Sequence, residues 1–215
     1  MYEQQPIKQN ILKTAFDKCL AGLFLIITSP LFIVIVLASL LDSLFFSEDR
    51  GPVFYKEKRI SQGELFGFYK FRIFKQKALD KMMAERGIII TKELEYGQNN
   101  ITRFGKVLQK VYLDELPQLW NVFTGDISFV GTRPWNPFEY EKEIAKGVYR
   151  KKIIKAGLVG AVQINKGKFN GIEEEWALDY DYIEKCKTLS PFRLLLLDIS
   201  IIAKSILVML KAKGL

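Results

Sequence analysis

The sequence predicts an α+β fold in which an apolar helix lies at each end of a helix-rich domain. Three observations support this prediction: a 23-residue run without charge near the N-terminus, two aromatic-rich segments spaced as a β-hairpin, and an apolar C-terminal segment with regularly spaced cations. They divide the chain into a membrane segment, a compact central domain with the small β-hairpin, and an amphipathic surface helix, with limits at 1–48, 49–188 and 189–215.

Composition narrows the chemistry that the chain can perform. The 215 residues carry a net charge of +8, which fits nucleic acid, an anionic membrane surface or phosphorylated ligands as partners. Histidine is absent, which removes the commonest general base and excludes a Ser/His/Asp triad. Cys19 and Cys186 have neither a zinc nor a redox spacing, so they indicate a reduced, cytosol-facing protein. Any catalysis must therefore rest on carboxylates, Lys, Tyr or Cys.

The uncharged run at 19–41 is long enough to cross a bilayer. As a straight helix it would extend about 35 Å, against a hydrocarbon core of about 30 Å. Pro30 deletes one helical hydrogen bond, and the Ser29 hydroxyl can satisfy the freed group. Cations flank the run on both sides, at Lys8, Lys13 and Lys18 before it and at Arg50, Lys56, Lys58 and Arg59 after it. The positive-inside rule then favours both ends in the cytoplasm. On the residues alone, a spanning helix and a re-entrant helix that bends at Ser29-Pro30 are equally open.

The C-terminal segment predicts an amphipathic helix that begins at Ser190 and Pro191. Its polar residues Arg193, Ser200, Lys204 and Lys211 form one narrow stripe on a largely apolar surface, and Asp198 and Ser205 lie off that stripe. Such a helix fits the headgroup boundary of a membrane, and docking against the domain core is the alternative. A second spanning helix is disfavoured, because Asp198 and Lys204 would lie near the middle of the bilayer.

The segments 51–60 and 65–74 are expected to pair as strands. Both are rich in Phe, Tyr, Val and Ile, and Ser61-Gln62-Gly63 between them suits a turn. Lys70 and Arg72 are two positions apart, so on a strand they project from the same face. That face fits a bound anion as well as it fits a solvated strand edge protected by charge.

Two adjacent acids, Asp114 and Glu115, precede Pro117 in a stretch, 101–123, that otherwise reads as helix. Adjacent helical positions differ by about 100°, but at a break introduced by Pro117 the two carboxylates can flank one site from two directions. The alternative is a helix junction whose acids are stabilised by the dipole of a helix N-terminus. Spacing alone favours this second interpretation. The polar residues at 75–100 predict a variable insert with some helix.

Two glycine-rich runs, 125–134 and 155–168, carry cations beside turns. Glycine lets the backbone approach a ligand closely, and the planar guanidinium of Arg133 suits a phosphate. Together with the acid pair, these runs are typical of a site in which cations bind phosphates while carboxylates hold Mg²⁺ and one of them attacks.

The chain resembles the small monotopic phosphoglycosyl transferases of the bacterial sugar transferase family, over nearly its whole length and in the family's order. The most specific part is LDELPQLWNVFTGDISFVGTRP at 113–134, and the other matches are FDKCLAGLFLIITSPLF, GPVFYKEKRI, FYKFRIF, ITRFGKVL, GLVGAVQIN and DYDYIEK. Thr132 departs from the family's usual proline. Gln109 and Tyr112 stand in a stretch that is often Arg-Arg-Thr-Ser-Leu, which removes an arginine that the family could use on phosphate.

The resemblance implies transfer of a sugar-1-phosphate from a nucleotide diphosphate sugar, usually a UDP-sugar, to a polyprenol phosphate, with polyprenyl-diphosphate-sugar and UMP as products. It implies Asp114 as the nucleophile of a covalent phosphosugar-aspartate intermediate and Glu115 as the acid associated with Mg²⁺. The cations expected at the substrate phosphates are Lys70, Arg72, Arg103 and Arg133. Because a carboxylate is ionised at pH 7, such a nucleophile needs no histidine as base.

The resemblance also implies a membrane course and a set of partners. It makes the 19–41 segment re-entrant, with the break at Ser29 and Pro30 and with the catalytic domain on the cytoplasmic face of a bacterial inner membrane. The expected partners are the UDP-sugar, a polyprenol phosphate such as undecaprenyl phosphate, membrane phospholipids and a second copy in a homodimer, without nucleic acid. The reaction would initiate glycoconjugate or polysaccharide assembly. Contacts to the sugar are expected in 75–100 and after Arg133.

A non-enzymatic, membrane-anchored module that binds lipids or nucleic acid is the alternative function. It rests on the net charge and the terminal helices, and the sequence carries no RNA- or DNA-binding signature. A member of the same fold that has lost activity is disfavoured by the intact acid pair. Function that survives replacement of both Asp114 and Glu115 by alanine would favour the binding module.

Overall fold

The computed structural model describes residues 5–87, 89–97, 99–165 and 171–211, without the side chains of 209–211. The chain forms two compact units, which are described separately. Unit 1 comprises Met1–Leu23, Lys58–Gly67 and Trp120–Leu215, and unit 2 comprises Phe24–Glu57 and Phe68–Leu119. The domain limits expected from the sequence stay a prediction.

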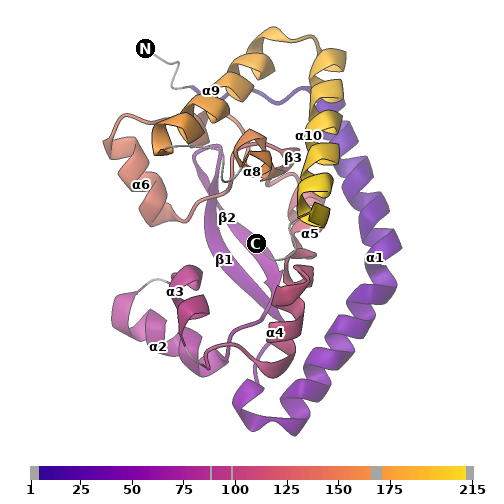
Figure 1. Cartoon of the computed structure of the whole chain (residues 1–215), viewed down its shortest axis with the longest axis vertical. Coiled ribbons are helices and arrows are strands. Elements are labelled where there is room, and N and C mark those ends of the chain that lie inside the picture. Colours follow the sequence, from indigo (N-terminus) through magenta and orange to yellow (C-terminus); the bar gives the residue numbers. More distant parts are fainter. Residues whose placement is uncertain (1–4, 88, 98, 166–170, 212–215) are drawn as a thin grey trace. The chain divides into compact units, whose positions relative to one another are not determined.

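Helices dominate both units (Figure 1). They are α1 (Ile11–Phe45), α2 (Gln76–Arg86), α3 (Thr91–Tyr96), α4 (Arg103–Lys110), α5 (Gln118–Thr124), α6 (Pro137–Ala145), α7 (Arg150–Ile153), α8 (Ala161–Ile164), α9 (Ile172–Thr188) and α10 (Pro191–Lys211), with the short 3-10 helices η1 (Ser47–Asp49) and η2 (Leu113–Glu115). The strands are β1 (Phe54–Ser61) paired with β2 (Glu64–Phe71), and β3 (Ser128–Val130) paired in parallel with β4 (Gly157–Val159). The helix-rich fold with a small hairpin is confirmed, whereas the sequence does not predict the three-residue strands β3 and β4.

Helix α1 continues through Ser29 and Pro30, so the break expected there is not an end of the helix. Proline lacks the N–H that would donate to the carbonyl of Ile26, four residues earlier. The Ser29 hydroxyl donates to that carbonyl at 2.7 Å and replaces the missing bond. The helix therefore has no end at this position, and the expected repair by serine is confirmed. The expected bend at Ser29-Pro30 stays a prediction. The re-entrant course stays a prediction.

Helix α1 has the length and the apolar character to cross a membrane. Only 11% of its 18-residue apolar window is buried, whereas the core helix of a soluble protein is mostly buried. Large apolar side chains such as Ile26 and Ile33 lie exposed on it. This exposure fits a helix that is surrounded by lipid.

The β1–β2 hairpin turns at Gln62 and Gly63, as the sequence predicts. Both residues have positive φ, 53° and 80°, which is the geometry of a type I′ two-residue turn. Strand β2 ends at Phe71. Arg72 is the next residue, and its backbone N–H still donates to the carbonyl of Val53 at 2.8 Å. The expectation that Lys70 and Arg72 project from the same face stays a prediction.

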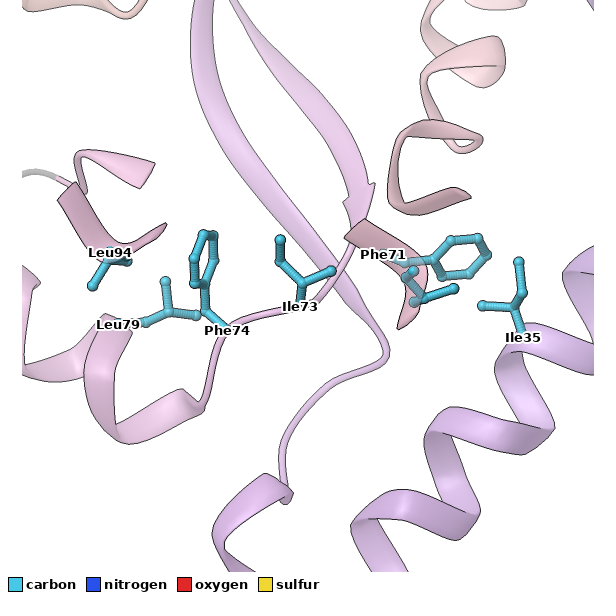
Figure 2. Packing of buried hydrophobic residues seen from close by; sticks show 7 residues of the cluster. Ile35, Phe71, Ile73, Phe74, Leu79 and Leu94 are labelled. Atoms are coloured by element: carbon cyan, nitrogen blue, oxygen red, sulfur yellow. The ribbon is translucent and has the colours of Figure 1, made fainter. Parts of the chain in front are cut away.

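Unit 2 has a continuous apolar core. Its buried cluster consists of Ile35, Phe71, Ile73, Phe74, Leu79, Leu94 and Leu108. In Figure 2, Leu79 of α2 and Leu94 of α3 lie beside Phe74. Ile35 of α1 lies beside Phe71 at the end of β2 (Figure 2). The insert at 75–100 therefore forms two short helices and supplies core residues to unit 2.

Helix α4 begins against the segment that leaves β2. The Thr102 hydroxyl accepts a hydrogen bond from the N–H of Gly105 at 2.8 Å, and the N–H of Thr102 donates to the carbonyl of Ile73 at 2.8 Å. A Cβ on Gly105 would stand 2.4 Å from that carbonyl oxygen, closer than a real Cβ can come. Glycine thus allows α4 to start at this place, and the start of α4 sets the position of the residues that follow it.

In unit 1, helix α10 buries one face against β3, β4 and α8. The buried residues recur at helical spacing and are Leu194, Asp198, Ile201 and Ser205. The carboxylate of Asp198 accepts hydrogen bonds from Lys13 Nζ at 2.5 Å and from the Tyr182 hydroxyl at 2.6 Å. Lys13 is therefore an internal partner of α10, and it is wrong to count it as a free cation beside the membrane run.

The opposite side of α10 exposes Phe192 and Leu196 together with Arg193 and Lys204. The docking alternative is thus confirmed for one face of the helix. The expected position of the other face at a membrane surface stays a prediction. Lys211, the last residue of the expected polar stripe, lies outside the described side chains.

Candidate active site

The adjacent acids Asp114 and Glu115 lie in the turn η2, between α4 and α5 in the chain. The turn follows Tyr112, whose φ of 56° lies in the left-handed region. Bulky side chains rarely adopt this conformation, and here it redirects the chain after α4. The helix expected at 101–123 is therefore interrupted at Tyr112, before the acids, and not only at Pro117.

The carboxyl group of Asp114 is removed from water, with 6% of the residue exposed. Burial raises its pKa from 3.8 to about 6, Lys70 opposes the rise, and the charge of Glu115 adds to it. The group is therefore mostly ionised at neutral pH while it carries few water contacts. Replacing the hydration shell of a charged nucleophile by protein is one way in which a site activates it.

Glu115 has a different environment from its neighbour. Its side chain is 44% exposed, and its Oε1 accepts a hydrogen bond from Lys70 Nζ at 3.1 Å. Lys70, one of the cations expected at phosphate, is thereby brought to the acid pair. One buried and one half-exposed carboxylate side by side are suited to two different roles in one reaction.

Arg72 is used inside unit 2. Its guanidinium donates to the carbonyls of Pro52 at 2.6 Å, Phe74 at 2.6 Å and Asp49 at 2.7 Å. Burial lowers the pKa of Arg72, and the nearby carboxylates of Asp49 and Asp42 oppose this effect. These contacts fix the exit of β2, and they give no support to the phosphate contact expected for Arg72.

Arg103 is the first residue of α4. Its guanidinium carbon lies 3.6 Å from the centroid of the Phe46 ring. The backbone N–H of Arg103 donates to Oδ2 of Asp49 at 3.1 Å. The side chain of Arg103 is exposed, as is that of Arg133, which follows β3 in unit 1. The phosphate contacts expected for these two arginines stay predictions.

A hollow in unit 2 contains Asp114 and Lys70. Its other lining residues are Tyr55, Phe71, Ile73, Phe74, Thr91 and Glu95. The charge of Glu95 contributes to the raised pKa of Asp114. Sequence reasoning missed Thr91 and Glu95 as individual residues, and only the expectation of sugar contacts within 75–100 points toward them.

Comparison with known protein families shows the family to which the chain belongs. The model of the family described as bacterial sugar transferase matches residues 8–212, which is nearly the whole chain. The chain belongs to the bacterial sugar transferase family. The resemblance carried by its sequence motifs is thereby confirmed.

Several bacterial proteins are similar to this sugar transferase. It is 31% identical over 163 residues to the galactosyl transferase CpsE of Streptococcus agalactiae serotype III (strain NEM316), covering 72% of this chain and 35% of that protein. It is 32% identical over 178 residues to the UDP-glucose:undecaprenyl-phosphate glucose-1-phosphate transferase of Escherichia coli (strain K12), covering 80% and 35%. It is 30% identical over 194 residues to the uncharacterized sugar transferase EpsL of Bacillus subtilis (strain 168), covering 88% and 86%. The chain thus spans about a third of the first two proteins and most of EpsL.

The acid pair of this sugar transferase has a donor set that fits Mg²⁺. This ion is commonly held by one or two protein carboxylates together with substrate phosphates and water. Glu115 offers a half-exposed carboxylate, and Asp114 lies next to it in the chain. Among the residues that the structure describes, no three His, Cys, Asp or Glu side chains form a cluster that could hold a metal. The two acids therefore fit an ion whose remaining ligands come from substrate and water.

Replacing Asp114 by asparagine is expected to stabilise the fold above pH 7. The raised pKa means that the ionised carboxyl costs the folded state free energy above pH 6, and that this cost disappears below about pH 4. The Asp114→Asn protein should therefore unfold at higher denaturant at pH 8, by on the order of 2–3 kcal/mol in the free energy of unfolding, with the difference shrinking from pH 6 to pH 4. Denaturant titrations of the detergent-solubilised protein measure it.

The matched control is Asp80→Asn, on the exposed surface of α2 in the same unit. It is expected to change the free energy of unfolding by less than about 0.5 kcal/mol at either pH. An Asp114→Asn protein that is no more stable than wild type at pH 8 would show that the carboxyl is well solvated.

Proposed function

We propose that this chain transfers a sugar-1-phosphate from a UDP-sugar to a polyprenol phosphate and so initiates glycoconjugate assembly. The observation that carries the proposal is the acid pair itself, with a buried Asp114 beside a half-exposed Glu115 that is bonded to Lys70. Membership of the bacterial sugar transferase family supports it. The name of the Escherichia coli relative, which joins UDP-glucose to undecaprenyl phosphate chemistry, supports the choice of both substrates.

In the proposed mechanism Asp114 is the nucleophile. One carboxylate oxygen attacks the β-phosphorus of the UDP-sugar, and the bond from this phosphorus to the bridging oxygen breaks, so that UMP leaves. The product on the protein is a mixed anhydride of Asp114 and the sugar phosphate. A phosphate oxygen of the polyprenol phosphate then attacks the same phosphorus, which yields polyprenyl-diphosphate-sugar and restores the carboxylate. Both steps conserve charge and need no histidine.

The main obstacle to this attack is repulsion between a carboxylate and a diphosphate. Lys70 lies at the acid pair, where it can bind an equatorial phosphate oxygen once it leaves Glu115. Arg133 and Arg103 are the further cations that the proposal assigns to phosphate. Mg²⁺ bound through Glu115 would neutralise charge on the diphosphate and on the departing UMP.

The sugar is proposed to contact helix α3. Thr91 and Glu95 line the hollow that also contains Asp114, and hydroxyl and carboxylate groups are suited to hydrogen bonds with sugar hydroxyls. A carboxylate this close to the nucleophile makes ionisation of Asp114 harder, so a hydrogen bond from the sugar to Glu95 also favours the attacking form. This assignment places a determinant of sugar choice in the 75–100 insert.

The proposed course of helix α1 through the membrane is re-entrant. The chain enters and leaves the cytoplasmic leaflet through α1, with Ser29 and Pro30 at the turning region, and the exposed face of α10 lies at the headgroups. An acceptor with a long hydrocarbon tail then reaches the site without leaving the bilayer, which saves about 0.8 kcal/mol for each methylene that stays in lipid.

The transfer is tested by UMP release from UDP-sugars with undecaprenyl phosphate and Mg²⁺. Because Asp114 attacks as a carboxylate, kcat/KM is expected to fall about tenfold per pH unit below pH 6. Lys70 lowers the pKa of Asp114, so Lys70→Met should move this midpoint to higher pH as well as reduce the rate. The matched control is Lys56→Met, whose ammonium lies over the Tyr69 ring on the neighbouring strand. A midpoint that stays in place in Lys70→Met, or full activity of Asp114→Asn, would refute the assignment.

The re-entrant course is tested by labelling single cysteines on the two sides of the apolar run. Lys8 and Ser47 are both exposed. Each is replaced by cysteine in a chain in which Cys19 and Cys186 are replaced by serine. Both cysteines should react with a membrane-impermeant maleimide only in inverted inner-membrane vesicles. Reaction of one of them from the opposite side would establish a spanning helix instead.

A further inference from the structure

The segment 131–135, which follows β3 in unit 1, has its backbone held at almost every position. The N–H of Gly131 donates to the carbonyl of Val159 at 3.0 Å, and the carbonyl of Thr132 accepts from Gly157 at 2.8 Å. The carbonyl of Trp135 accepts from the N–H of Ile60 at 2.8 Å. The backbone of this segment is thus hydrogen-bonded to β1 on one side and to both ends of β4 on the other.

Within this segment only Arg133 has an exposed side chain, since Gly131, Thr132 and Pro134 are buried and Trp135 is half-buried. The carbonyl of Pro134 accepts a hydrogen bond from Arg59 at 3.4 Å. A rigid backbone around one exposed arginine is the arrangement by which a fold directs a guanidinium at a ligand. The carbonyl of Arg133 is the remaining backbone group in this segment whose hydrogen bond can fix the direction of the arginine.

That carbonyl is held by Lys151 of helix α7. The Nζ of Lys151 donates to it at 2.9 Å and lies 4.5 Å from the centroid of the Trp135 ring, and the lysine is 2% exposed. Burial and the adjacent guanidinium of Arg150 lower the pKa of Lys151 to about 7. Both the ammonium and the neutral amine carry N–H groups, so the donor persists on either side of this pKa.

The stability of this region gives little reason for a buried lysine at position 151, because the neighbouring Arg150 already supplies a buried cation. Arg150 donates to Asp179 Oδ2 at 2.5 Å and also pairs with Glu143, and these groups form the buried ionic network of this region. Methionine would occupy the space of Lys151 without the free energy of burying an ammonium. Besides the contact of its ammonium with the Trp135 ring, lysine adds the hydrogen bond to the carbonyl of Arg133.

We propose that Lys151 is a positioning residue, which fixes the backbone of Arg133 so that its guanidinium meets the phosphates of the sugar donor. This inference rests on the proposed function, in which Arg133 binds donor phosphate. Lys151 touches neither substrate nor the acid pair in this assignment, and its effect passes entirely through Arg133.

A double-mutant cycle on the full-length protein in detergent or nanodiscs separates this role from general stabilisation. UMP release is measured against donor concentration for wild type, Lys151→Met, Arg133→Ala and the double variant, and the melting temperature of each is recorded. Lys151→Met should raise the donor KM about tenfold with kcat changed less than about twofold. In the Arg133→Ala background the same substitution should raise KM no further. Lys152→Met, the next residue on the same helix, is the matched control and should leave KM unchanged.

An increase in KM that persists in the Arg133→Ala background would overturn the proposal, because Lys151 would then act on something other than Arg133. An unchanged KM in Arg133→Ala overturns it as well, with sugar transfer itself left intact. Failure of wild type to release UMP refutes instead the proposed function. If Lys151→Met melts below the assay temperature, the cycle is repeated with Lys151→Arg. Arginine keeps the positive charge but changes the position of the N–H group that donates to the carbonyl of Arg133. The smaller rise in KM of Lys151→Arg should also vanish when Arg133 is absent, and a rise that remains overturns the proposal.

Discussion

The buried guanidinium of Arg72 is the interaction on which unit 2 depends. It binds three backbone carbonyls, those of Asp49, Pro52 and Phe74, where β2 ends. Hydrogen bonds from a charged donor contribute about 1.5–3 kcal/mol each, so this cation links the segment before β1 to the segment after β2. The carboxylate of Asp49 in turn accepts the N–H of Arg103 at the start of α4. The position of α4, and of the acids that follow it, is thereby fixed from the strand exit.

The acid pair shows how one sequence step can give two chemical environments. A continuous helix would separate Asp114 and Glu115 by about 100° on one cylinder. The positive φ of Tyr112 instead starts a tight turn, which buries the first carboxyl and leaves the second half-exposed beside Lys70. Burial raises the pKa of Asp114 only to about 6, so the group gives up hydration without giving up its charge at neutral pH. This balance lets a carboxylate serve where many enzymes use a histidine-activated nucleophile.

Local chemistry in the sequence was sufficient to predict the hairpin at Gln62-Gly63, the apolar helix and the acid pair. It could not predict features that depend on distant partners. Nothing near Tyr112 signals a left-handed residue, and the partners of Arg72 are backbone carbonyls, which any sequence supplies. The pairing of Lys13 with Asp198 joins residues 185 positions apart, so Lys13 looked like a free flanking cation. Thr91 and Glu95 could not be predicted as site residues for the same reason, because only the fold places α3 at the hollow that contains Asp114.

Covalent transfer of the sugar phosphate through Asp114 is tested by a reaction without the acceptor. The protein is mixed with an accepted UDP-sugar and Mg²⁺ but without polyprenol phosphate, and UMP and the mass of the peptide containing Asp114 are measured. A covalent intermediate should give a burst of about one UMP per protein molecule and a phosphosugar on that peptide, both absent from Asp114→Asn. Adding undecaprenyl phosphate should remove the phosphosugar from the peptide. UMP that forms only when the acceptor is present, with no modified peptide, would contradict the covalent intermediate and establish direct transfer between the two substrates.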